Sequence, residues 1–290
     1  MNPISPSSPE AAELGRVLEA RVDQTLHDLE SVTSSSRPGP ESLHRLHRDL
    51  RRLRVGLGVW TRASSKGRQE ALRAYDRRLK HLARLVGGVR DRDVALGLLA
   101  QAPADLPSRE RRALRRLRVH LTDDARIGRE LIRASLRTER DLGLFEGIRD
   151  GFRTLPSARR AQALGRYLEE VHQEGQEAVR LAHRKARRKP TSRRLHTLRI
   201  RVRSWRHLSD LAAAIDPSYG VAEARPLQSL QARLGRLHDL DVVEDLTADS
   251  APPAWNRAIR KERRRQQDKV VRTLRSSHWR EMVPTLAVPA

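Results

Sequence analysis

Two segments of the chain carry cation-forming side chains at the same helical spacing. Positions i, i+3, i+7 and i+10 are His44, His47, Arg51 and Arg54 in the first segment and His196, Arg199, Arg203 and Arg206 in the second. At about 100° per residue, each set falls within a band roughly 80° wide on one side of a helix. Arginine forks bind phosphate oxygens through paired hydrogen bonds, and a histidine ring N–H donates to the same kind of acceptor. The two segments therefore predict the binding of phosphate groups.

Two other interpretations of these segments compete with phosphate binding. A single basic helix flank is most often a solvated face, but the repeated register of histidine and arginine favours a functional role. His44 and His47 could share a metal ion, but Arg199 replaces the second histidine in the other segment, and a guanidinium cannot be a ligand. The chain has no cysteine, which excludes disulfides, thiolate metal sites and a cysteine nucleophile. No catalytic residue, metal ligand or cofactor is predicted.

A second pair of similar segments, residues 79–94 and 227–242, lies downstream of the first pair. Glycines at 87, 88 and 235 are typical of helix C-termini, because glycine adopts positive φ. Asp93 and Asp241 then predict the N-caps of new helices, since their carboxylates accept free backbone N–H groups.

The same segments add basic side chains with acidic neighbours. Arg90 is followed by Asp91 and His238 by Asp239, and these carboxylates are placed to orient a neighbouring cation toward a ligand. The Asp-x-Asp pattern also fits Mg²⁺, but a formal net charge of +23 disfavours a bare divalent cation. Lys80 contributes a further cation in the first copy.

The elements that position these residues are helices. Leucine, valine or alanine recurs every three or four residues over most of the chain, clusters of Pro, Gly and Ser interrupt the pattern, and no strand-like alternation occurs. This predicts an all-α protein of roughly eight to ten helices. The two motifs recur in the same order about 150 residues apart, which predicts two similar helical bundles, residues 11–155 and 158–283, related by a pseudo-two-fold axis. Residues 1–10 are expected to form a disordered tail, and residues 155–157 the link.

The charge points to a polyanionic partner. A net charge of +23 favours nucleic acid, an anionic membrane surface or a phosphate polymer. No apolar run approaches the roughly 20 residues that span a bilayer, and residues 1–10 lack the features of a signal peptide, which predicts a cytoplasmic protein. Aromatic residues are scattered rather than clustered in the basic motifs, which argues against single-strand nucleic-acid binding. No G-x-x-x-x-G-K-[ST] loop for phosphoryl transfer occurs.

The doubled pattern, LHRLHRDLRRLR with LKHLARLVGGVRDRDV and LHTLRIRVRSWR with LQSLQARLGRLHDLDV, resembles the CHAD domain, the conserved histidine α-helical domain. The resemblance implies two four-helix bundles with a central basic channel that binds inorganic polyphosphate without catalysis, in some members at storage (polyphosphate) granules. It assigns the channel cations to these positions: His44, Arg51, Arg52, Arg54, Lys80, Arg90, His196, Arg199, Arg203, Arg206 and His238. Three positions depart from the family pattern, namely His47, Ser204 and Gln228. The alternative function is a nucleic-acid binder, and weak backbone-only affinity for DNA or RNA is expected as a side activity.

Three further basic runs, residues 109–118, 184–194 and 260–265, remain after this assignment. Solvated helix faces account for such runs in most proteins. Some of them are placed to extend the positive field and to steer a polyanion toward the channel.

Overall fold

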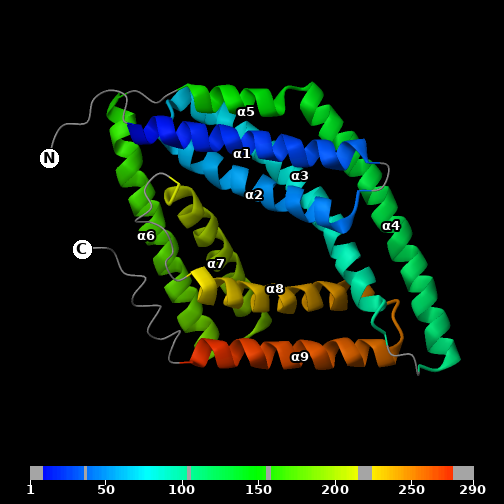
Figure 1. Ribbon diagram of the computed structural model, residues 1–290. Helices are drawn as coiled ribbons and strands as arrows, with labels where there is room; N and C mark the ends of the chain where they lie inside the picture. The colour runs from blue at the N-terminus through cyan, green and yellow to red at the C-terminus, as the bar shows by residue number, and fades with distance from the viewer. Residues whose placement is uncertain (1–8, 36–37, 103–105, 155–157, 215–223, 277–290) are drawn as a thin grey trace. The chain divides into compact units, whose positions relative to one another are not determined.

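The computed structural model describes residues 9–35, 38–102, 106–154, 158–214 and 224–276, with side chains left out at 9–10, 158–166 and 224–226. Within these ranges the chain is all-α and contains no strand. Its nine helices there are α1 (Pro9–Ser34), α2 (Pro40–Ala63), α3 (Lys66–Leu99), α4 (Ser108–Asp141), α5 (Leu144–Arg153), α6 (Ala158–Arg188), α7 (Ser192–Ala212), α8 (Ala224–Thr247) and α9 (Pro253–Arg275) (Figure 1). The predicted fold class is confirmed.

Most helix boundaries follow the predicted breakers. Helices α2 and α9 each begin with a proline in the first turn, where the missing N–H would have had no intrahelical acceptor. Helix α6 ends just before the Lys-Pro-Thr sequence at 189–191, and α7 begins at Ser192. Helix α1 already includes Pro9 and Glu10, whereas residues 1–8 and the predicted link at 155–157 lie outside the described part of the chain.

The predicted helix ends in the second motif are wrong. Helix α3 runs without interruption through Gly87, Gly88 and Asp93, and α8 runs through Gly235 and Asp241. Gly87 serves close packing instead: a Cβ there would lie 3.3 Å from Cε1 and Nε2 of His47. Asp241 is not an N-cap, because it lies inside α8. Its carboxylate forms an ion pair with Arg263.

The described helices form two compact units, each made of three segments. Unit 1 comprises residues 1–88, 128–173 and 206–221, and unit 2 comprises residues 89–127, 174–205 and 222–290. The boundaries between segments fall inside α3, α4, α6 and α7. Each unit therefore draws residues from both copies of the repeat. The bundle limits 11–155 and 158–283 stay a prediction.

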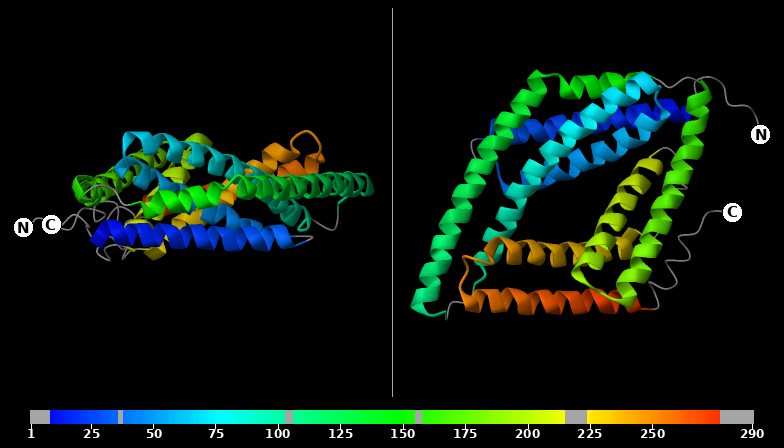
Figure 2. Two further views of the ribbon diagram at one scale, coloured as in Figure 1. Left: turned by 90° about the horizontal axis from the view of Figure 1, so that it is seen from above. Right: turned by 180° about the vertical axis from the view of Figure 1, so that it is seen from behind.

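In unit 1, α1 packs along α2 and α5, as both views in Figure 2 also show. Gly56 in α2 permits this approach, because a Cβ there would lie 2.1 Å from Cδ2 of Leu18. Trp60 anchors the core: its indole N–H donates to the Gly151 carbonyl at 2.8 Å, and its ring meets Phe152 edge-on with centroids 5.8 Å apart. The apolar face of α2 is thereby buried, and its basic flank is held at the edge of the core.

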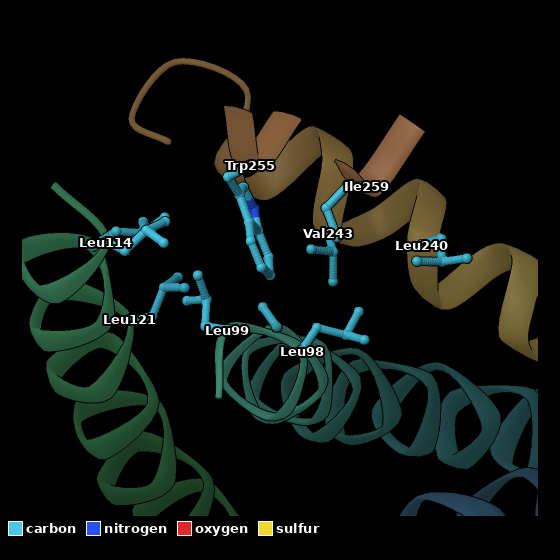
Figure 3. Packing of buried hydrophobic residues seen from close by; sticks show 10 residues of the cluster. Leu98, Leu99, Leu114, Leu121, Leu240, Val243, Trp255 and Ile259 are labelled. Atoms are coloured by element: carbon cyan, nitrogen blue, oxygen red, sulfur yellow. The ribbon is translucent and has the colours of Figure 1, made fainter. Parts of the chain in front are cut away.

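In unit 2, α8 packs along α9, and one core cluster joins these helices to the ends of α3 and α4 (Figure 3). Trp255 of α9 points into this cluster toward Leu98 and Leu99 of α3 and Val243 of α8. Trp255 and Val243 are 3% and 0% exposed, so the cluster fixes α8 and α9 against α3. The two copies of the second motif lie on α3 and α8, so the packing of these helices determines which of their residues lie close together.

Candidate anion-binding site

Five basic side chains from both copies of the repeat gather in unit 2. Helix α3 supplies Arg90, α7 supplies His196, Arg199 and Arg203, and α8 supplies His238. The predicted apolar band of α7 is buried, since Leu195, Leu198, Val202 and Trp205 are each at most 2% exposed. Burial of that band fixes the rotation of α7, so its basic flank lies at the margin of the core. We call these five residues the unit 2 cluster.

Arg90 connects the two copies of the second motif. Its guanidinium donates to Asp91 of its own helix at 3.3 Å and to Asp239 of α8 at 3.1 Å. The sequence placed Asp239 beside His238, and the structure pairs it with an arginine 149 residues away. Both carboxylates are thus engaged by one arginine, which is itself held in a fixed orientation.

The two histidines of the cluster lie against each other. The ring centroids of His196 and His238 are 5.2 Å apart. Burial, together with Arg199, His196, Arg90 and Arg203, lowers the pKa of His238 to about 3. Burial and the arginines of α7 also lower the pKa of His196. Both rings are therefore neutral at pH 7, and the surrounding positive charge opposes their protonation.

Arg199 and Arg203 face this site without an acidic partner. Both are half-buried, and neither forms a hydrogen bond or an ion pair with any residue that the structure describes. The Nη1 atom of Arg203 is buried and has no acceptor there. Burial and the neighbouring arginine lower the pKa of Arg199 to about 10. Half-buried guanidinium groups that lack acceptors are costly, and an anion placed between them would remove that cost.

Unit 1 contains a second group of basic side chains, which is more completely paired. Arg52 of α2 contacts Asp49 at 3.5 Å and Asp210 of α7 at 3.8 Å, and Arg206 contacts the same Asp210 at 4.0 Å. Arg21 of α1 donates to the Arg52 carbonyl at 3.4 Å. Burial and the charge of Arg52 lower the pKa of Arg21 to about 10. No pattern in the sequence pointed to Arg21, which lies outside both motifs. Asp210 was also missed, although its i,i+4 spacing from Arg206 could have indicated it.

The other predicted site residues of unit 1 have varied environments. His47 is 5% exposed and packs against Gly87, so it is part of the α2–α3 contact. Arg54 is held by Asp76 through two hydrogen bonds of 2.8 and 3.2 Å. His44 and Lys80 are exposed, and Arg51 is half-buried. The structure assigns these residues to unit 1 and not to the unit 2 cluster.

Neither a metal-binding cluster nor a membrane-spanning helix is found among the described residues. No group of three or more His, Cys, Asp or Glu side chains there is placed to hold a metal ion. Of the helices in those same residues, none has the length and apolar character required to cross a bilayer.

Comparisons with known proteins agree with this architecture. The CHAD domain family matches residues 16–248, which include both copies of both motifs. The crystal structure of the CHAD domain from the plant Ricinus communis is similar with a TM-score of 0.64 and 18% identity, over 92% of this chain and 91% of that one. PptA from Streptomyces chartreusis is similar with a TM-score of 0.57 and 15% identity, over 97% of this chain and 99% of that one. A comparison with curated proteins gave no match.

Proposed function

The chain belongs to the CHAD domain family, and from this premise we propose that it binds inorganic polyphosphate through the unit 2 cluster, aided by the basic residues of unit 1. The observation that carries the proposal is the state of Arg199 and Arg203, which are half-buried and lack an acceptor among the described residues. Phosphate groups offer several oxygen acceptors each and a full negative charge, which matches these two forks.

The cluster supports binding rather than phosphoryl transfer. Its five side chains can donate hydrogen bonds, and the neighbouring carboxylates of Asp91 and Asp239 both accept from Arg90. Ligand-free His238, with a pKa lowered to about 3, is too weak a base for that reaction, and a bound phosphate would favour its protonated form, which is a hydrogen-bond donor. The proposed role is therefore to hold the polymer. The proposed location is the cytoplasm, including polyphosphate granules.

The test compares two double variants of equal charge. Arg199→Gln with Arg203→Gln removes the acceptor-free pair, and Arg112→Gln with Arg116→Gln removes two exposed cations of α4. A hydrogen bond to a charged group contributes about 1.5–3 kcal/mol, so the first variant should lose at least tenfold in affinity for polyphosphate. The second should lose less than about fivefold, because each exposed charge contributes about 0.5 kcal/mol or less.

Three outcomes are informative. Equal losses in the two variants would show that net charge, not the cluster, binds the polymer. RNA that displaces polyphosphate at equal phosphate concentration would favour the nucleic-acid alternative. Steady release of phosphate from polyphosphate in the presence of Mg²⁺ would contradict a binding role and favour an enzyme.

A further inference from the structure

Helix α9 carries a basic surface that is separate from the unit 2 cluster. Its exposed side forms a hollow of about 540 Å³. The cations around that hollow are Arg257, Arg260, Lys261, Arg264, Arg265 and Arg272, all exposed. The opposite side of α9 is apolar and buried through Trp255, Ile259, Val270 and Leu274. The outward side is therefore predominantly basic, and we call it the α9 basic face.

The α9 basic face has almost no internal compensation. Asp268 is the one acidic residue around the hollow. Only Arg265 of the six cations forms an ion pair within the described residues, at 3.7 Å from Glu262 of the same helix. Like charges three and four residues apart on a helix repel each other by a few tenths of a kcal/mol per pair. Such a row is stabilised when an external anion lies along it.

The shape of the face indicates an extended anion. From Arg257 to Arg272 the cations follow the helix axis for about 22 Å, at about 1.5 Å per residue. The hollow has no aromatic side chain on which single-stranded bases could stack, and no apolar side chain that could enter a bilayer. These features favour a flexible polymer of phosphate groups, recognised by charge alone.

The α9 basic face also lies in the same unit as the unit 2 cluster. Arg263, on the inner side of α9, donates to Asp241 of α8 and to Ser192 at the start of α7, each at 2.5 Å. Asp241 is close enough to His196 to act on its charge. Helix α9 is thus fastened to the two helices that carry most of the cluster. A polymer held by the cluster has a high effective concentration at this neighbouring face.

The family match ends at residue 248, before α9 begins at Pro253. We propose that the α9 basic face is a second docking surface for inorganic polyphosphate, which adds affinity only for chains that extend beyond the unit 2 cluster. This inference rests on the proposed function of the cluster. The proposal makes the preference for long chains a property of α9, because triphosphate occupies only the unit 2 cluster, whereas a long chain contacts both surfaces.

The experiment measures affinity for triphosphate and for a long polyphosphate of about 100 units, in the full chain. The test variant is Arg257→Gln with Arg260→Gln and Arg264→Gln, none of which has an ion pair among the described residues. The variant should bind triphosphate like the wild type and long polyphosphate about tenfold more weakly. The slope of log K against log salt for the long chain should fall by about 2, at roughly 0.7 per lost phosphate contact.

Two matched variants control for charge and for folding. Arg112→Gln with Arg115→Gln and Arg116→Gln removes three exposed cations of α4 and should bind both ligands like the wild type. Replacement of the three α9 arginines by lysine keeps the charge and should retain long-chain affinity, as expected if α9 acts through charge. Unchanged triphosphate binding by the glutamine variant is the control for folding of unit 2.

The failures are distinguishable. If the wild type binds neither triphosphate nor the long chain, the proposed function is wrong. If the wild type binds both and the α9 glutamine variant matches it, the second docking surface is refuted while the cluster stands. If that variant loses duplex DNA but keeps long polyphosphate, the α9 basic face serves nucleic acid and the proposal is overturned.

Discussion

Phosphate binding at the unit 2 cluster should be coupled to proton uptake by His238. In the structure, burial and the charges of Arg199, His196, Arg90 and Arg203 lower the pKa of this ring to about 3. A phosphate beside the ring offsets that repulsion and accepts a hydrogen bond from the ring N–H, so binding must raise the pKa. A group whose pKa rises on binding takes up a proton, and acid therefore strengthens the complex.

The low pKa of His238 in the ligand-free protein sets the size of the effect. If binding returns the pKa of His238 to its ordinary value of about 6.5, the association constant grows about 30-fold between pH 7.5 and pH 5. If the pKa rises only to about 5, the gain is about twofold over the same interval. Either gain is lost when the ring is replaced, so His238→Gln isolates the contribution of this residue from that of the other histidines.

Titration calorimetry in buffers of different ionisation enthalpy measures both the affinity and the number of protons taken up. A long polyphosphate is the suitable ligand, because its terminal phosphates, which titrate near neutral pH, are a small part of the chain. The wild type should gain affinity on acidification, and His238→Gln should gain clearly less. The reasoning is refuted if both proteins show the same pH dependence and the His238 resonance keeps its pKa when polyphosphate is added.

The remaining predictions concern stability. Arg199→Gln with Arg203→Gln should raise the melting temperature of the ligand-free protein, because it removes two half-buried cations that repel each other and lack acceptors; a lower melting temperature would show that these arginines hold the fold together. Gly235→Ala should raise the free energy of unfolding by about 0.5–1 kcal/mol in urea denaturation, since a Cβ there meets nothing within 4 Å. Gly87→Ala should gain less because of His47, and equal gains would contradict the packing role given to Gly87.

Periodicity predicted the helices well because each helix depends on its own apolar spacing. The boundaries near residues 34–40, 188–192 and 247–253 coincide with proline and small polar residues that interrupt the apolar pattern. The apolar bands of α2 and α7 are buried as their spacing required. These features are local, and local sequence contains the information that determines them.

The helix ends predicted in the second motif are wrong because glycine and aspartate each occur in more than one structural role. Glycine at a helix end and glycine at a close helix contact look alike in a sequence, and Gly87 belongs to the latter class. Aspartate likewise caps helices in many proteins, but Asp241 accepts from Arg263, which is 22 residues downstream. Only tertiary packing distinguishes these uses: α2 against α3 for Gly87, and α8 against α9 for Asp241.

The site itself depends on pairings between distant positions. The two motifs supplied the residues of the candidate site, but nothing in either motif indicated that Arg90 would take Asp239 as its partner. The same holds for the contact between Asp210 and Arg52, which lie 158 residues apart, whereas the contact between Asp210 and Arg206 is a local i,i+4 pair. Long-range ion pairs of this kind follow from tertiary packing, which periodicity does not specify.

The crossed pairing explains why the cluster stays positive. Asp239 is near enough to act on the charge of Arg199 on helix α7, but the residue with which it forms an ion pair is Arg90. Arg90 engages both Asp239 and Asp91, and so leaves the two arginines of α7 without an acid within ion-pair distance among the described residues. Arg90→Gln should therefore weaken phosphate binding by more than one lost cation accounts for, because it frees two carboxylates to compete with the anion for Arg199 and Arg203. Arg90→Gln combined with Asp239→Asn should recover part of that affinity, and a double variant no better than the single one would show that Arg90 acts only through its own charge.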